Sequence, residues 1–309
     1  MSYLADLTLR LAAGASRLPE PLCTRHAAYL ARQQQPDGGF AGRRGASDLY
    51  YTGFGLRGLA LLGALDSPQA EAAARYLRPQ LGRGLAPIDF LSLVFSAVVL
   101  DALAGLDVFA AAGLDRAAEV ARLVAPYHRP DGGYAKSERS GQTSTYHTFL
   151  TVACLDLLRL PLVEPHCTVK LLRDRRRPDG GFVELPVMTH SGTNPTAAAI
   201  GLLKMLGSLD DSLCQDAASF LAHMQTTDGG LRAHDRIGLP DLLSTFTGLV
   251  ALADLDRLST VNLPAAVRWV EALQQPGGGF RGARWDDTTD VEYTFYGLAA
   301  LAITKKDEG

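Results

Sequence analysis

A turn with two successive glycines recurs at a nearly constant spacing along this chain of 309 residues. The five turns span residues 36–40, 130–134, 178–182, 227–231 and 276–280. The residues before the glycine pairs are 94, 48, 49 and 49 positions apart, so the first interval is about two periods long. A period of this length indicates repeated supersecondary units. We therefore expect six units, the second of which keeps only Gly82 and Gly84 of its turn.

Each unit has an amphipathic segment before its turn and an apolar segment after it. In the last unit, apolar residues recur every three or four positions over residues 263–273, which is typical of a helix with one buried face. Residues 290–303 are apolar on nearly every side, so the helix they form must be buried. The amphipathic helices should begin near Cys23, Gln69, Ala117, Pro165, Leu213 and Pro264, and the apolar helices near Asp48, Pro87, Thr145, Asn194, Asp241 and Asp290.

Six outer and six inner helices predict an all-α fold, because no stretch shows strand alternation long enough to build a sheet. Inner helices that are apolar on every side favour closure, since an open array would leave one inner face in water. We expect a single domain over residues 1–309, an (α/α)6 barrel or toroid of six helical hairpins preceded by a short N-terminal helix. All inner helices should then begin at one rim.

The composition excludes several classes of function. A net charge of −3 and the lack of basic runs with interleaved aromatics argue against nucleic-acid binding. The four cysteines have no metal or disulfide spacing, and the N-terminus lacks the basic start of a signal peptide, so we expect a cytoplasmic protein. The longest apolar stretches, such as residues 90–100, are shorter than the roughly 20 residues that span a bilayer, so we expect no transmembrane segment.

The turn and the helix after it carry a recognisable motif. The first unit reads Gln-Gln-Pro-Asp-Gly-Gly-Phe-Ala-Gly-Arg over residues 34–43 and Asp-Leu-Tyr-Tyr-Thr-Gly-Phe-Gly-Leu over residues 48–56. The last unit repeats it over residues 278–282 and 290–298. Over almost the whole chain, this repeat resembles that of protein prenyltransferase β subunits and class II terpene cyclases. The resemblance implies an α/α toroid whose apolar central cavity takes an isoprenoid chain.

The resemblance also implies a zinc ion that activates an acceptor thiolate. In the transferases, Asp-x-Cys at the start of one inner helix and a His from the next unit hold this ion. The closest matches, Asp290-Val291-Glu292 and Asp48-Leu49-Tyr50, both lack the Cys, and the His position of the first unit is Tyr51. His147 stands in the His register, and the unit before it offers Asp89. The candidate metal ligands are Asp290, Glu292, Asp89 and His147, and Zn²⁺ is a candidate cofactor whose full ligand set is absent.

The positions that bind the diphosphate in the family match this sequence better than the zinc-ligand positions do. Arg43 follows Phe-x-Gly as in the family, and Arg284 is one place off in the last unit. Tyr51 and Tyr293 match the Tyr that follows the Asp-x-Cys motif. The resemblance therefore gives as candidate substrate-binding residues Arg43, Arg284, Tyr50, Tyr51, Tyr146 and Tyr293. The candidate catalytic residues are Asp290, Glu292, Asp48 and His147.

Each candidate also has a simpler interpretation. Asp48 and Asp290 open helices, where Asp is a preferred N-cap. Glu292 suits the first turn of a helix, although a carboxylate in an otherwise apolar helix is costly to bury without a partner. A lone histidine such as His147 is more often a hydrogen-bonded structural residue than a ligand. The aromatic residues of the inner helices are either core or the lining of a prenyl pocket.

The sequence favours a prenyltransferase-like enzyme that binds an isoprenoid diphosphate of the farnesyl or geranylgeranyl class and transfers the prenyl group to an acceptor. A helical α-type subunit or a second copy of the chain is the expected protein partner. One alternative is a class II-type terpene cyclase, in which Asp287 or Asp290 donates a proton because crowding raises one carboxyl pKa. Another is a non-catalytic isoprenoid-binding toroid, which would explain the missing Cys. Prenyl length and acceptor do not follow from the sequence.

Overall fold

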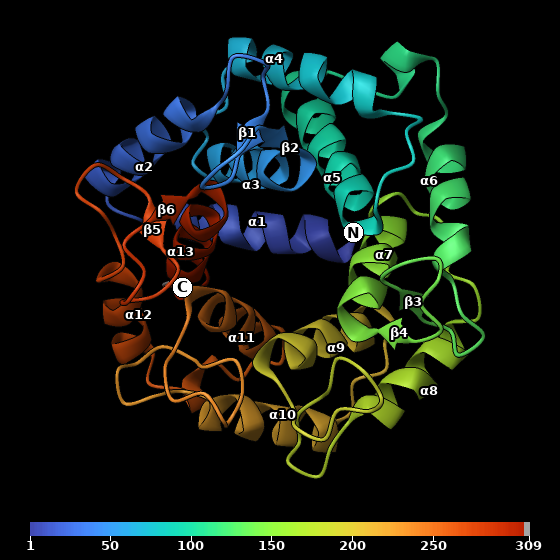
Figure 1. The fold of residues 1–309 in the computed structure, drawn as a ribbon. Helices are drawn as coiled ribbons and strands as arrows, with labels where there is room; N and C mark the ends of the chain where they lie inside the picture. The colour runs from blue at the N-terminus through green and yellow to red at the C-terminus, as the bar shows by residue number, and fades with distance from the viewer. Residues whose placement is uncertain (306–309) are drawn as a thin grey trace. The chain divides into compact units, whose positions relative to one another are not determined.

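The computed structural model describes residues 1–305, and most of this chain is helical (Figure 1). The amphipathic helices are α2 (Glu20–Gln33), α4 (Ser67–Leu77), α6 (Arg116–Val124), α8 (Pro165–Arg175), α10 (Asp211–His223) and α12 (Leu263–Glu271). The apolar helices are α3 (Leu49–Leu61), α5 (Pro87–Ala104), α7 (Thr145–Leu157), α9 (Thr193–Met205), α11 (Leu242–Asp254) and α13 (Val291–Ile303). Helix α1 (Tyr3–Ala15) precedes them. The expected alternation of six hairpins is therefore confirmed.

The described residues form two compact units. Unit 1 contains residues 1–7 and 124–272, and unit 2 contains residues 8–123 and 273–305. Within unit 1, α9 packs against both α7 and α11. Within unit 2, α3 packs against both α5 and α13, so the last hairpin lies against the first. Residues from the two ends of the repeat array are therefore neighbours within unit 2.

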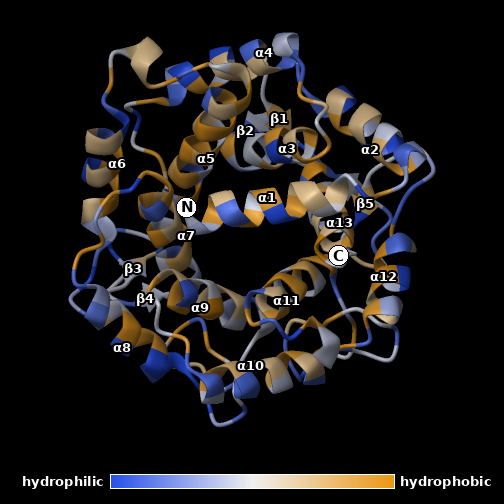
Figure 2. Cartoon of the chain, turned by 180° about the vertical axis from the view of Figure 1, so that it is seen from behind, coloured by the Kyte–Doolittle hydropathy of each residue, from blue (hydrophilic) through white to orange (hydrophobic). Residues whose placement is uncertain are grey.

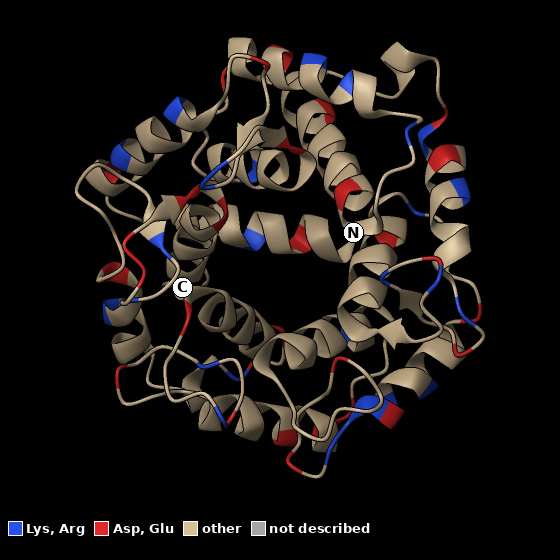
Figure 3. Ribbon diagram, viewed as in Figure 1, with Lys and Arg blue, Asp and Glu red and all other residues tan. Residues whose placement is uncertain are grey.

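Charged side chains are concentrated outside the apolar helices. Figure 2 shows the apolar helices mostly in hydrophobic colours, and Figure 3 shows most charges on the amphipathic helices and the loops. Helix α3 contains one charged residue, Arg57, and helix α13 also contains one, Glu292. Because burying an ionised group costs free energy unless it is paired, these two side chains are candidates for function.

A buried threonine joins each complete turn to the apolar helix after it. The backbone amide of the residue after the glycine pair donates to this threonine's hydroxyl over 2.8–3.2 Å. In four repeats the same hydroxyl donates to the carbonyl of the helix N-cap residue. The five threonines are fully buried: Thr52, Thr148, Thr196, Thr245 and Thr294. This contact fixes where each apolar helix begins.

The first glycine of each pair is required by both backbone conformation and packing. Gly38 has a φ of +93°, and a Cβ there would lie 2.1 Å from the carbonyl oxygen of Ala72 in α4. Gly278 also has a φ of +93°, and a Cβ there would lie 2.6 Å from the Cβ of Tyr29 in α2. The turn of each of these hairpins therefore packs directly against the amphipathic helix of the next one.

The second unit lacks this turn, as expected. The 3₁₀ helix η1 (Arg78–Gln80) follows α4, and Gly82 in the connection to α5 has a φ of +73°. The other short 3₁₀ helices are η2 (Ala110–Ala112), η3 (Ala125–Tyr127) and η4 (Leu258–Thr260).

Three turns are followed by strand pairs of two residues each, which are too short to form a sheet of their own. The antiparallel pairs are β1 (Phe40–Ala41) with β2 (Ser47–Asp48), β3 (Tyr134–Ala135) with β4 (Thr143–Ser144), and β5 (Phe280–Arg281) with β6 (Thr289–Asp290). In each pair, the aromatic residue after the turn lies opposite the N-cap residue of the next helix. The loop between paired strands is thereby held above the start of that helix.

Helix α5 is longer than the sequence analysis expected. It has 18 residues and a mean hydropathy of 1.8, which passes a length and composition test for crossing a membrane, and 44% of it is buried inside the protein. It packs against α3 and α4. A core helix of a soluble protein passes the same test, so the absence of a transmembrane segment stays a prediction.

We predict that Thr245→Val destabilises the protein by about 1–3 kcal/mol, because it leaves the buried amide of Leu231 without an acceptor while keeping the side-chain volume. Thr245→Ser keeps the hydroxyl and is the matched control. Urea unfolding of the two variants measures the difference. Equal stabilities would show that the hydroxyl does not hold the turn.

A second prediction concerns His26, which is fully buried in α2 and stacks on Phe280. Its Nδ1 accepts a hydrogen bond from the amide of Gly279 over 3.0 Å, so its Nε2 carries the proton and donates to Gln274. Burial lowers the pKa of His26. The unfolded chain therefore binds the proton more tightly, and stability should fall as the pH drops below about 6.5. Between about pH 7.5 and pH 5, the free energy of unfolding should fall less steeply for His26→Gln than for the wild type. Equal slopes would contradict this.

Candidate functional site

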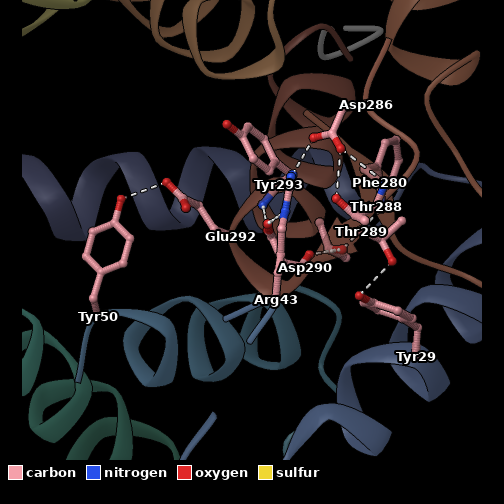
Figure 4. A network of polar contacts seen from close by, with 11 residues as sticks. Tyr29, Arg43, Tyr50, Phe280, Asp286, Thr288, Thr289, Asp290, Glu292 and Tyr293 are labelled. Atoms are coloured by element: carbon pink, nitrogen blue, oxygen red, sulfur yellow. Dashed lines mark hydrogen bonds and ion pairs between the residues drawn. The ribbon is translucent and has the colours of Figure 1, made fainter. Parts of the chain in front are cut away.

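The first turns of α3 and α13 bring a group of polar side chains together in unit 2 (Figure 4). Both helices begin with an aspartate N-cap. Asp48 accepts from the amide of Tyr51 over 2.7 Å, and Asp290 accepts from the amide of Tyr293 over 2.8 Å. The simpler interpretation of these aspartates as helix caps is therefore correct.

Asp290 is also bound by Arg43, which lies on the loop between β1 and β2. The Arg43 guanidinium donates from Nε to Asp290 over 2.8 Å and from Nη2 to Asp286 over 2.5 Å. It also lies 5.3 Å from the ring centre of Tyr293. Burial raises the pKa of Asp290, while the Tyr293 amide and Arg43 act in the opposite direction. Both carboxylate oxygens of Asp290 are thus engaged, one by the helix and one by the arginine.

Glu292 is held in a different way. The Tyr50 hydroxyl donates to Glu292 Oε1 over 2.7 Å, and Figure 4 shows the two side chains facing each other. Burial raises the pKa of Glu292, and the hydrogen bond from Tyr50 partly offsets this. A carboxylate with a raised pKa is a stronger proton acceptor than an ordinary glutamate.

Aromatic rings surround this carboxyl–phenol pair. The Phe54 ring centre lies 4.9 Å from that of Tyr50, 5.1 Å from that of Tyr296 and 5.7 Å from that of Phe295. The Arg57 guanidinium lies 4.2 Å from the ring centre of Phe54 and 5.0 Å from that of Phe295. We call Tyr50, Phe54, Phe295 and Tyr296 the aromatic wall. Tyr50 is half-buried and the other three rings are buried; the faces of such rings attract positive charge, as the position of Arg57 shows.

The remaining candidates of unit 2 make the surroundings acidic. Burial raises the pKa of Asp48, and the charge of Asp89 raises it further. Burial also raises the pKa of Asp89 itself, which lies in the first turn of α5. The pKa of Tyr51 is raised by burial and by the carboxylates of Glu292, Asp290 and Asp48. Arg284 is exposed on the loop between β5 and β6.

Tyr146 and His147 belong to unit 1, where they open α7 beside Ser144 and Glu184. Ser144 Oγ contacts a Glu184 oxygen and lies 2.9 Å from His147 Nδ1, while the Tyr146 amide donates to Glu184 over 3.1 Å. Because Glu184 can only accept when ionised, Ser144 donates to it, and the assigned tautomer of His147 has its proton on Nδ1. Burial, with help from Lys136, lowers the pKa of His147. Its Nε2 therefore carries a lone pair.

The described residues do not fit the zinc site that the resemblance implied. Within residues 1–305, no three His, Cys, Asp or Glu side chains are placed to hold a metal ion. Glu292 stands where the motif has Cys, and Asp290 is engaged by its helix and Arg43. Asp89, Asp290 and Glu292 of unit 2 are part of no such group among the described residues, and neither is His147 of unit 1.

Sequence reasoning missed three residues of these clusters. Arg57 lies on the same face of α3 as Tyr50 and Phe54, and a single charge in an apolar helix was the signal for it. Glu184 takes the place of the glycine in the Phe-x-Gly motif, and Ser144 takes the place of the capping aspartate. The departure of each from the repeat pattern could have indicated them.

The chain belongs to the prenyltransferase alpha-alpha toroid domain family, whose sequence model matches residues 22–92 and 69–308. This match confirms the expected all-α toroid class. The chain is 28% identical over 193 residues to the β subunit of protein farnesyltransferase from Pisum sativum. This alignment covers 57% of this chain and 42% of that subunit. It therefore spans less than half the length of this relative.

Two solved structures show the same fold at low sequence identity. Protein geranylgeranyltransferase-I from Candida albicans, complexed with GGPP, has a TM-score of 0.74 at 16% identity and 91% coverage of both chains. A type II terpene cyclase from Scytonema, in complex with its product merosterolic acid A, has a TM-score of 0.59 at 15% identity and 97% coverage of both. Because one fold carries different reactions, the function must be argued from the site.

We predict that Arg43→Ala destabilises the protein by about 1–2 kcal/mol at pH 7, because it leaves the buried Asp290 carboxylate without its cation. This is the low end for a charged hydrogen bond, since 34% of the Arg43 side chain is exposed. The folded-state pKa of Asp290 is already raised, so ionising it costs stability as the pH rises. The loss should therefore be larger at about pH 7 than at about pH 4 in urea unfolding. Asp286→Asn is the control, with a smaller effect; an equal loss at both pH values would contradict the pairing.

Proposed function

We propose that this protein binds an isoprenoid diphosphate of the farnesyl or geranylgeranyl class and transfers its prenyl group to an acceptor. The observation that carries the proposal is the aromatic wall of unit 2, built on the first and last repeats of a prenyltransferase-family domain. Ring faces suit both an apolar polyene and the positive charge that develops as the diphosphate leaves. The similarity to a farnesyltransferase β subunit supports the same substrate class.

Catalysis of this kind depends on positioning and on stabilising the leaving diphosphate. Arg57 at the aromatic wall and the exposed Arg284 are the cations we assign to this task. Arg43 is already paired with two aspartates, so a diphosphate would have to displace one of them. We also propose a cytoplasmic location and a protein partner, either an α-type helical subunit or a second copy. No step is assigned to zinc, because the described residues do not fit it.

A class II-type cyclisation is the second candidate, and the raised pKa of Glu292 favours it. A partly buried carboxyl group that keeps its proton could protonate a double bond of an isoprenoid chain held against the aromatic wall. Glu292 replaces the acids expected from sequence, because Asp290 is paired with Arg43 and Asp287 is 96% exposed. A cyclase started by a proton releases no diphosphate, whereas a transferase releases one for each turnover. A purely binding protein would do neither.

We predict that farnesyl or geranylgeranyl diphosphate binds to the purified full chain and that Arg57→Gln weakens this binding by roughly tenfold, about 1.4 kcal/mol. Lys170→Gln, on the exposed face of α8, is the matched control and should bind as the wild type does. Isothermal titration measures binding, and a coupled assay measures released diphosphate. Absence of diphosphate binding would contradict the proposal. Conversion of the isoprenoid substrate without release of diphosphate would favour the cyclase.

A further inference from the structure

We propose that Glu292 is the general base of this reaction and that the acceptor is a hydroxyl compound, an alcohol or a phenol, instead of a metal-activated thiolate. This inference rests on the proposed prenyl transfer and specifies its acceptor. It begins from the disagreement between the residues present and the zinc site of the family.

The surroundings of Glu292 disfavour an anionic nucleophile. A thiol reacts as its thiolate, which nearby carboxylates disfavour and a metal ion or another positive charge favours. Here Asp48, Asp89 and Asp290 lie in the same unit, and carboxylates raise the pKa of Tyr51. No three-ligand metal group exists among residues 1–305 to offset them. A neutral acceptor that loses its proton only as it reacts fits this charge distribution.

We assign this proton to Glu292, the carboxyl group of the cluster that is hydrogen-bonded to a residue of the aromatic wall. Asp48 and Asp290 each bind a backbone amide of their own helix, and Asp290 and Asp286 are ion-paired with Arg43. Glu292 is bound by the phenol of Tyr50 over 2.7 Å, and Tyr296 and the charge of Arg57 also favour its ionised form. It also lies beside the aromatic wall, where the prenyl chain would be held.

The proposed step balances without any further reactant. The bond between the prenyl C1 carbon and the diphosphate oxygen breaks, and the electron pair leaves with the diphosphate. The acceptor oxygen forms a bond to C1, and its proton passes to the Glu292 carboxylate. After the prenyl ether has left, Glu292 returns the proton to water.

Tyr50 is a positioning residue in this scheme. The groups that face Glu292 are Tyr50, Tyr51 and Arg57 on α3, the N-cap residue Asp290 and Tyr296 on α13. The hydrogen bond from Tyr50 favours the ionised carboxylate and so lowers its pKa. A base must be unprotonated to act, so its rate falls as the pH drops through its pKa. Removing the Tyr50 hydroxyl should therefore move this acid limb to higher pH.

The test uses the full chain with farnesyl or geranylgeranyl diphosphate and three probe acceptors: 4-methylphenol, 1-octanol and a peptide with a C-terminal cysteine. We expect ether formation with a hydroxyl probe, unchanged by a chelator. Glu292→Gln should lower kcat by about 100-fold or more while leaving diphosphate affinity within roughly twofold. Tyr50→Phe should keep activity at high pH and shift the acid limb of kcat/KM upward. The control Glu71→Gln, exposed on α4, should behave as wild type.

The outcomes separate this inference from the proposed function. If only the peptide is prenylated, and this depends on zinc and is normal in Glu292→Gln, the inference is overturned. The proposed function of prenyl transfer would still hold. Diphosphate binding without prenylation of any hydroxyl probe would also overturn it. Absence of diphosphate binding in the wild type would overturn both. If Glu292→Gln does not fold, judged by circular dichroism, the pH profile of Tyr50→Phe decides: an unmoved acid limb contradicts the role of Glu292.

Discussion

The hydrogen bond between each glycine turn and a buried threonine organises this molecule. It ties the residue after the turn to the first turn of the next apolar helix, while the threonine binds the N-cap carbonyl in four of the repeats. The start of each helix is thereby fixed relative to its own turn. In unit 2 this places the caps Asp48 and Asp290 at the beginnings of two neighbouring helices, α3 and α13.

These positions explain why the carboxylates of Asp290 and Glu292 have different hydrogen-bond partners. In an aspartate that caps a helix, one carboxylate oxygen accepts a hydrogen bond from a backbone amide. In Asp290 the other oxygen accepts from Arg43. Glu292 lies two residues further along, in the first turn of α13, and its carboxylate accepts a hydrogen bond from the Tyr50 phenol. Partial burial then raises its pKa.

Much of the fold could be predicted from the sequence, because a repeat of glycine turns and alternating helical patterns is a local signal. The starts of the apolar helices were predicted within a residue or two, as at Pro87, Thr145 and Asn194. The threonine contact was missed because no single repeat makes it stand out. The site was harder: the pairing of Arg43 with Asp286 and of Tyr50 with Glu292 joins residues about 240 positions apart. Only packing of the last hairpin on the first brings them together.

The central claim is that Glu292 is a partly buried proton carrier, and its own titration tests this most directly. Infrared spectroscopy of protein labelled with ¹³C-glutamate can follow each glutamate carboxyl group as the pH changes, and subtraction of Glu292→Gln isolates the signal of Glu292. The account predicts a carboxyl group that titrates above the ordinary glutamate value of about 4.3 and is missing from the variant. A Glu292 signal that titrates at or below that value would contradict it.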